Sequence, residues 1–151
     1  MKRKVFFLVI LAVLSIVSGY LMSKASWIGR VGMTLFYKEY NLLKIWWQGA
    51  AAVYVFMLLL FAGHSFVQRM LRPVTARLLH ILALMTAITA LYFTYDDFHT
   101  DFSHKLLGWR FHYGFYLVWI EWMLMCLFFA FTRRPLNVSA KNADKTASLT
   151  P

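Results

Sequence analysis

The sequence WWQGAAAVYVFMLLLFAGHSF occupies residues 46–66 and contains no charged side chain. About 20 apolar residues in a helix cross the roughly 30 Å hydrocarbon core of a bilayer. Three further apolar runs of comparable length occupy residues 5–22, 78–94 and 111–131. Backbone groups in lipid must be hydrogen-bonded within the protein, and these runs lack the alternating pattern of a membrane barrel. The sequence therefore predicts an all-α integral membrane protein with four transmembrane helices.

The connections between the runs predict an antiparallel four-helix bundle. The segment 68–77 is short and contains Pro73, so the second and third helices are expected to form a hairpin. Segment 23–44 interleaves aromatic and basic side chains, which favour the headgroup level, so it is expected to lie at the membrane interface after the first helix. We interpret residues 1–131 as one transmembrane domain and residues 132–151 as a disordered cytoplasmic tail.

The formal net charge of +10 is unevenly distributed along the chain. Ten of the sixteen basic residues precede the first run, separate the second from the third, or follow the fourth, and Asp144 is the only acid among them, so this side carries +9. The opposite side carries +2. Basic segments stay cytoplasmic during insertion and are attracted to anionic lipid. Both termini are therefore predicted to be cytoplasmic, in a membrane such as the bacterial inner membrane, and nucleic acid is not an expected partner.

The first run also has features of a cleaved secretory signal. A basic start, an apolar stretch and the small residues up to Ala25 fit such a signal. However, the apolar stretch exceeds the usual 7–15 residues, and Lys24 lies beside the candidate cleavage site. A retained helix is therefore favoured over cleavage of residues 1–25, and the later helices have the same orientation in both cases.

Glu121 lies at the middle of the fourth run, where an ionised carboxylate costs at least about 2.5–3.5 kcal/mol. No basic residue occurs at a comparable depth in the four runs, so burial favours the neutral acid. The hydroxyls of Ser15, Ser18 and Thr86 are the candidate partners. Glu121 is a candidate proton or ion relay. The alternative is a neutral acid that holds two helices together by a hydrogen bond.

The segment after the third run combines carboxylates with imidazoles. Asp97, Asp101 and His104 are spaced i, i+4 and i+7, which places them on one face if the helix continues, and His112 begins the fourth run nearby. Imidazole and carboxylate ligands suit Zn²⁺, Mn²⁺ or Fe²⁺. These four residues are therefore candidate ligands of a divalent metal on the outer face. The alternative is a solvated acidic segment that only affects topology.

Two further histidines occur at matching depths on the opposite side of the membrane. His64 lies near the inner end of the second run and His80 near the inner start of the third. A hairpin would bring them together, and two histidines on neighbouring helices can be axial ligands of a b-type haem. The alternative is a pair of interfacial histidines that bond loop carbonyls or lipid headgroups.

Several patterns typical of enzymes do not occur in the sequence. There is no HExxH, GxSxG or phosphate-binding glycine loop, and the single cysteine, Cys126, excludes a CxxC pair. Small residues at 18–19, 49–52 and 62–63 are predicted to let helices approach closely. The abundant Trp, Tyr and Phe side chains are interpreted as membrane-interface belts and lipid-facing bulk.

We therefore expect a small polytopic membrane protein that is an accessory or assembly subunit rather than an enzyme. Its expected partners are lipids and other membrane-protein subunits or a second copy of the chain. The outer metal site would belong to this function. Two other hypotheses stay open: a redox protein with haem b on His64 and His80, and a proton- or cation-coupled carrier centred on Glu121.

Overall fold

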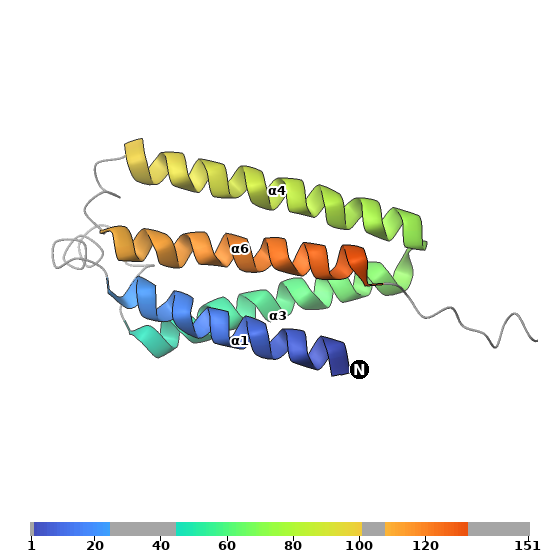
Figure 1. Cartoon of the computed structure of the whole chain (residues 1–151), viewed down its shortest axis with the longest axis horizontal. Helices are drawn as coiled ribbons and strands as arrows, with labels where there is room; N and C mark the ends of the chain where they lie inside the picture. The colour runs from blue at the N-terminus through green and yellow to red at the C-terminus, as the bar shows by residue number, and fades with distance from the viewer. Residues whose placement is uncertain (1, 25–44, 101–107, 133–151) are drawn as a thin grey trace, which may run out of the picture.

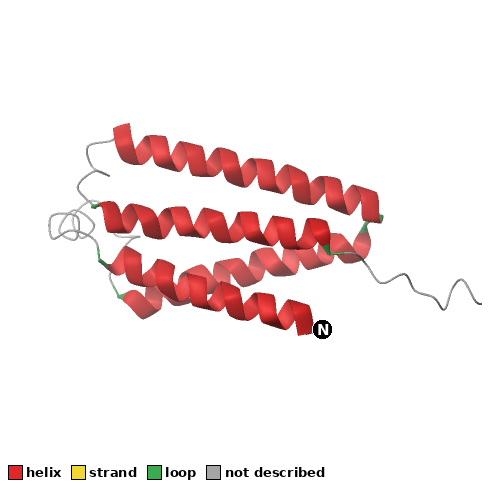
Figure 2. Ribbon diagram, viewed as in Figure 1, coloured by secondary structure: helices red, strands yellow, loops and turns green. Residues whose placement is uncertain are grey.

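The computed structural model describes residues 2–24, 45–100 and 108–132, and its regular structure there is entirely α-helical (Figure 2). The helices are α1 (Lys2–Ser23), α3 (Trp46–Met70), α4 (Pro73–Thr100) and α6 (Trp109–Phe131). At 1.5 Å per residue, even the shortest helix, with 22 residues, is long enough to cross the hydrocarbon core. The prediction of an all-α protein with four helices of membrane-spanning length and composition is confirmed.

The connection between α3 and α4 is shorter than the sequence pattern indicates. Helix α3 ends at Met70, and the backbone of Leu71 is extended. Helix α4 already begins at Pro73, because a fixed φ and a missing N–H are tolerated in the first turn of a helix. The residue before a proline disfavours helical φ and ψ, which explains the break before Pro73. The hairpin turn therefore consists of two residues.

Helix α4 also continues beyond its apolar run, through the predicted start of the acidic segment to Thr100. Hydrophobicity marks the part of a helix that can lie in lipid, whereas backbone hydrogen bonding can continue into polar sequence. Helix α6 begins after Gly108, whose φ of 87° lies in the left-handed region that favours glycine. The carbonyl of Gly108 accepts a hydrogen bond from the Phe111 amide at 3.1 Å, which closes the first turn.

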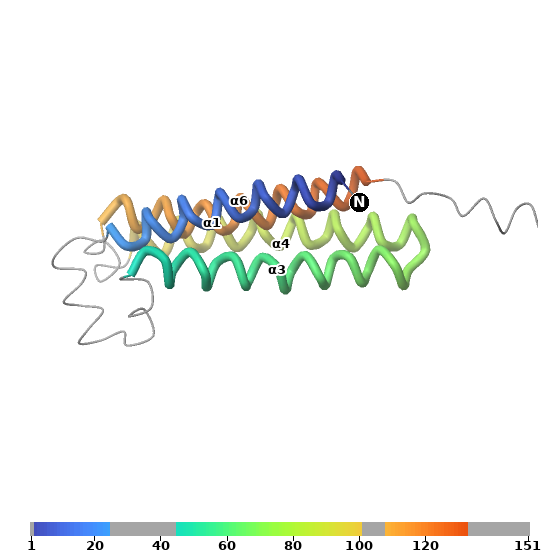
Figure 3. Tube along the Cα trace, turned by 90° about the horizontal axis from the view of Figure 1, so that it is seen from below, coloured from blue at the N-terminus to red at the C-terminus, as the bar shows by residue number. Residues whose placement is uncertain are grey.

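Helix α6 contacts each of the other three helices, and α1 packs mainly against α3 and α6 (Figures 1 and 3). Contacts between α1 and α6 run in opposite sequence order: Phe7 stacks on Phe128, and Ser18 bonds to Gly114. Helix α4 lies along α6 on the side away from α1, as Figure 1 shows. The side chains that meet between neighbouring helices therefore come from different apolar runs of the sequence.

Small residues produce the closest helix contacts. A Cβ added at Gly19 would lie 2.6 Å from the Ala50 Cα, and one added at Gly114 would lie 2.6 Å from a Met22 side-chain atom. The predicted close approach at 18–19 and 49–52 is therefore confirmed. The same prediction for 62–63 is wrong at Gly63, because a Cβ there would meet no heavy atom within 4 Å.

The core is narrow, and most of the apolar surface remains uncovered. Leu11, Met57 and Met125 are fully buried, whereas Leu59 and Leu82 are 67% and 62% exposed. Exposure of large apolar side chains along every helix would be unfavourable in water, since burial of apolar area contributes roughly 25 cal/mol per Å². The same surface suits a lipid environment, in which hydrocarbon covers the outer faces of the helices.

Candidate functional site

The side chains of His64 and His80 meet, and together they form the centre of a buried polar cluster. The Nδ1 atoms of His64 and His80 are 2.8 Å apart, and the His80 side chain is almost fully buried. The indole Nε1 of Trp122 donates to His64 Nε2 at 3.3 Å, and the Cys126 Sγ lies 3.8 Å from the same nitrogen. The ring of Phe129 packs on both imidazoles. We call these five residues the histidine cluster.

The hydrogen bonds of the histidine cluster define its tautomers. An indole N–H can only donate, so His64 Nε2 accepts and, in the neutral imidazole, the proton is on Nδ1. This Nδ1–H then donates to His80 Nδ1, which places the proton of neutral His80 on Nε2. His80 Nε2 is buried and has no partner among the described residues. The chain of hydrogen bonds therefore runs from the Trp122 indole through His64 to His80. It ends at His80 Nε2–H, which is buried.

The geometry of the pair bears on the haem hypothesis. The two imidazole centroids are 4.9 Å apart, with direct contact between the rings. In a haem with two axial histidines, the iron and the porphyrin plane lie between the imidazoles. The rings would have to separate before both could ligate one iron. The haem hypothesis therefore stays a prediction that requires a different arrangement of α3 and α4.

Glu121 is fully buried in the middle of α6 and faces α1. The Ser15 hydroxyl donates to Glu121 Oε2 at 3.0 Å, whereas Glu121 Oε1 is buried with no partner among the described residues. The other two candidate hydroxyls bond elsewhere: Ser18 donates to the Gly114 carbonyl and Thr86 to the Leu82 carbonyl of its own helix. The structure thus selects Ser15 as the partner and makes the contact a hydrogen bond between two helices.

Removal of the Ser15 hydroxyl is expected to destabilise the α1–α6 contact. We expect Ser15→Ala to lower the free energy of unfolding in detergent by about 0.6–1.7 kcal/mol, the size of hydrogen bonds between membrane helices. Glu121→Gln retains an acceptor for the hydroxyl, so its effect should be smaller than that of Glu121→Leu. Thr86→Ala is the matched control, since that hydroxyl bonds only within α4. A Ser15→Ala variant as stable as Thr86→Ala would contradict the assignment.

The four predicted metal ligands are only partly placed. Asp101 and His104 lie outside the described residues. Asp97 is exposed near the end of α4, and the His112 ring stacks on Phe98 with centroids 4.3 Å apart. Within the described ranges, no group of three or more His, Cys, Asp or Glu side chains is arranged to hold a metal ion. The outer metal site stays a prediction that depends on Asp101 and His104.

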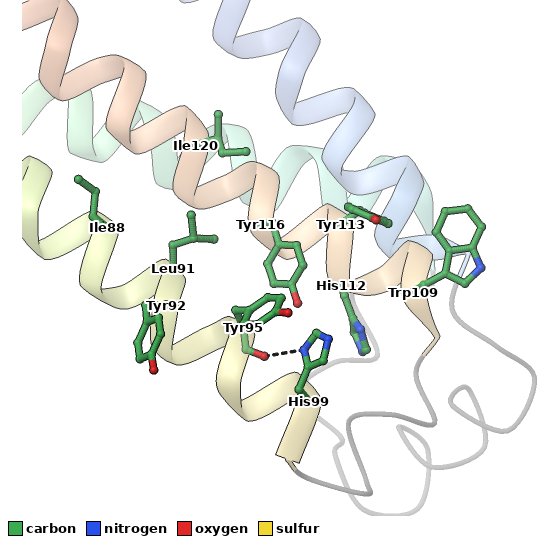
Figure 4. Close-up of a pocket in the computed structure, with 10 residues that line it drawn as sticks. All are labelled: Ile88, Leu91, Tyr92, Tyr95, His99, Trp109, His112, Tyr113, Tyr116 and Ile120. Atoms are coloured by element: carbon green, nitrogen blue, oxygen red, sulfur yellow. Dashed lines mark hydrogen bonds between the residues drawn. The ribbon is translucent and has the colours of Figure 1, made fainter.

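A groove that the sequence pattern did not single out lies between the C-terminal half of α4 and the N-terminal half of α6 (Figure 4). It has a volume of about 810 Å³, within the range of about 300–1,000 Å³ that is usual for small-molecule sites. Its aromatic lining consists of Tyr92, Tyr95, Trp109, Tyr113 and Tyr116, with the imidazoles of His99 and His112. Its aliphatic lining consists of Ile88, Leu91 and Ile120. We call it the outer groove, after the side of the membrane on which the charge distribution predicts it to lie.

Helical spacing in the sequence indicates each wall of the outer groove separately, but not the groove itself. Tyr92, Tyr95 and His99 follow each other at intervals of three and four residues on α4, as do Tyr113, Tyr116 and Ile120 on α6. Each set therefore lies on one face of its helix. The sequence alone favours lipid-facing aromatic residues, because nothing in it shows that these two faces adjoin. A hydrogen bond from Trp119 Nε1 to Thr94 Oγ1, at 3.0 Å, joins the two helices beside the groove.

These features define a class of protein: an all-α chain with four helices of membrane-spanning length, buried polar contacts between them and a groove at one end. Comparison with family models, with curated proteins and with solved structures gives no match to this chain.

Proposed function

We propose that the chain is an antiparallel four-helix transmembrane bundle that acts as a non-enzymatic accessory or assembly subunit of a larger membrane complex. The observation that carries this proposal is the use of the buried polar groups. Ser15 bonds to Glu121, Trp122 and His80 bond to His64, and each of these bonds joins different helices. In a catalytic site, such groups would converge on an accessible cavity. Here they bond to one another and hold the helices together.

The charge distribution supports an orientation with both termini in the cytoplasm. Arg69 and Arg72 lie at the turn between α3 and α4, and Lys2, Arg3 and Lys4 begin α1 at the same end of the structure (Figure 1). The opposite end has the acidic residues Asp96 and Asp97. Basic segments are retained on the cytoplasmic side during insertion. The turn and both termini would therefore face the cytoplasm.

Helix α4 offers the surface for a partner subunit or a second copy of the chain. It packs on α6 and, to a lesser extent, on α3, and its remaining apolar side chains are exposed. Val74, Leu78 and Leu82 are 72%, 62% and 62% exposed. Lipid alone can cover such a face, but a flat row of aliphatic side chains equally allows another transmembrane helix to pack along it. We therefore expect the assembly contact on this face of α4.

The proposal predicts that the protein travels with other subunits. Extraction in a mild detergent, followed by native electrophoresis and mass spectrometry of a tagged chain, should give a complex well above the 17.7 kDa of one copy. A photoreactive residue in place of the exposed Leu82 on α4 should cross-link to the partner. The same replacement at exposed position 59 on α3 is the control. A monomer with no cross-linked partner at either position would refute the proposal.

A further inference from the structure

The outer groove changes character along its length. Its lining is aliphatic where it reaches the middle of the helices, at Ile88 and Ile120, and aromatic and polar towards the ends of α4 and α6, at His99 and Trp109. If α4 and α6 cross a membrane, the aliphatic part lies at bilayer depth and the polar part at the interface. A ligand with a polar ring and an apolar tail would match this gradient when its tail points towards the bilayer centre.

Two groups at the polar end of the groove have hydrogen-bonding capacity that the described residues do not use. The Tyr116 hydroxyl is buried and has no partner among the described residues. His99 Nδ1 lies 2.9 Å from the Tyr95 carbonyl, which can only accept, so neutral His99 has its proton on Nδ1 and leaves Nε2 as an acceptor. Figure 4 shows the two side chains near the same end of the groove but on opposite walls, Tyr116 from α6 and His99 from α4. Together they offer one donor and one acceptor.

The charge of the lining restricts the ligand further. No Asp, Glu, Lys or Arg among the described residues lines the outer groove. A phospholipid headgroup would need a cationic partner for its phosphate, so this lining disfavours one. Flat aromatic rings instead surround the space: the Tyr95 and Tyr116 centroids are 6.1 Å apart, and the Tyr113 ring meets Tyr116 edge-on at 6.1 Å. Such walls suit an uncharged, planar ring.

We propose that the outer groove binds an isoprenoid quinone or its quinol. The Tyr116 hydroxyl donates to a ring oxygen of the quinone, and His99 Nε2 accepts the hydroxyl proton of the quinol form. The aromatic side chains contact the ring faces, and the aliphatic end holds the start of the isoprenoid tail. This binding site goes beyond the accessory function proposed above and does not depend on it.

The test is a titration of the full-length protein in lipid nanodiscs with a short-chain ubiquinone analogue, followed by quenching of tryptophan fluorescence. We expect saturable quenching, because Trp109 lines the groove. Tyr116→Phe should weaken binding five- to tenfold, and Leu91→Trp, which fills the aliphatic end, should abolish the saturable phase. Tyr54→Phe on α3, which does not line the groove, is the matched control and should bind like the unchanged protein.

The Tyr116→Phe variant also tests the site without ligand. Its hydroxyl has no partner in the described structure, so its removal should leave the thermal stability of the ligand-free protein unchanged or slightly raise it. Weaker quinone binding together with unchanged folding would support the proposal. Quenching that never saturates, equal affinity in the Tyr116→Phe and control proteins, or equal competition by a phospholipid or a sterol would overturn it.

Discussion

Replacement of Gly19 by alanine is expected to destabilise the protein more than the same change at Gly63 or Gly114. The added Cβ would lie 2.6 Å from the Cα and 2.8 Å from the Cβ of Ala50, and it would also contact the Ala50 backbone nitrogen. Backbone atoms cannot rotate away, so α1 and α3 must separate along their shared face. Overpacking of this kind costs about 1–3 kcal/mol, and Gly19→Leu should prevent the helices from associating. Unfolding titrations in detergent measure both effects.

Gly63 provides the matched control for Gly19. It lies within α3, and a Cβ there would meet no heavy atom within 4 Å. Gly63→Ala should therefore be neutral or should stabilise the helix by up to about 1 kcal/mol, since alanine restricts the unfolded chain more than glycine does. If Gly19→Ala and Gly63→Ala had the same stability, the close contact of α1 with α3 would not exist in the folded protein.

Truncation of His64 is expected to have the second large effect. His64→Ala removes a buried ring that bonds to His80 and Trp122 and packs on Phe129. The variant loses buried contacts and leaves an indole N–H and an imidazole without their partner. We expect a loss of about 2–4 kcal/mol from the cavity and the unsatisfied groups together. Chemical denaturation in detergent, followed by circular dichroism, provides the measurement.

A double-mutant cycle distinguishes a coupled pair from two separate histidines. If the contact between His64 and His80 is real, His64→Ala and His80→Ala together should cost less than the sum of the single variants, with a coupling of about 0.5–3 kcal/mol. His99→Ala is the control, since His99 is exposed and bonds only to a carbonyl of its own helix. Strictly additive effects would show that the two imidazoles do not share a hydrogen bond.

Part of the candidate sites could be predicted from sequence because depth in a membrane follows from position along an apolar run. The matching depths of His64 and His80 required only the run boundaries and a short hairpin, and the structure places the two side chains in contact. Likewise, the predicted mid-membrane depth of Glu121 limited its candidate partners to a few hydroxyls. The choice of Ser15 among them required the rotation of α1 relative to α6, which hydrophobicity does not specify.

The outer groove could not be predicted in the same way. Its two walls come from α4 and α6, whose facing sides are separated in sequence by a connection outside the described residues. Each tyrosine row alone resembles a lipid-facing belt. The hydrogen bond from Trp119 to Thr94 and the packing of Phe98 against Phe111 align the two rows so that a space remains between them. Only this alignment of the two helices shows that the tyrosine rows line a groove and are not separate lipid-facing surfaces.

The amino-acid sequence was sufficient to predict four helices of membrane-spanning length and the positions of the polar residues along them. Apolar runs of about 20 residues have few stable forms other than membrane-spanning helices, because lipid offers no hydrogen bonds to the backbone. Which polar groups contact one another became clear only from the tertiary structure. Helix rotation and lateral order depend on local packing, such as the contact of Gly19 with Ala50, rather than on average hydrophobicity. These contacts direct Glu121 to Ser15, join His64 to His80 and open the groove beside Tyr116.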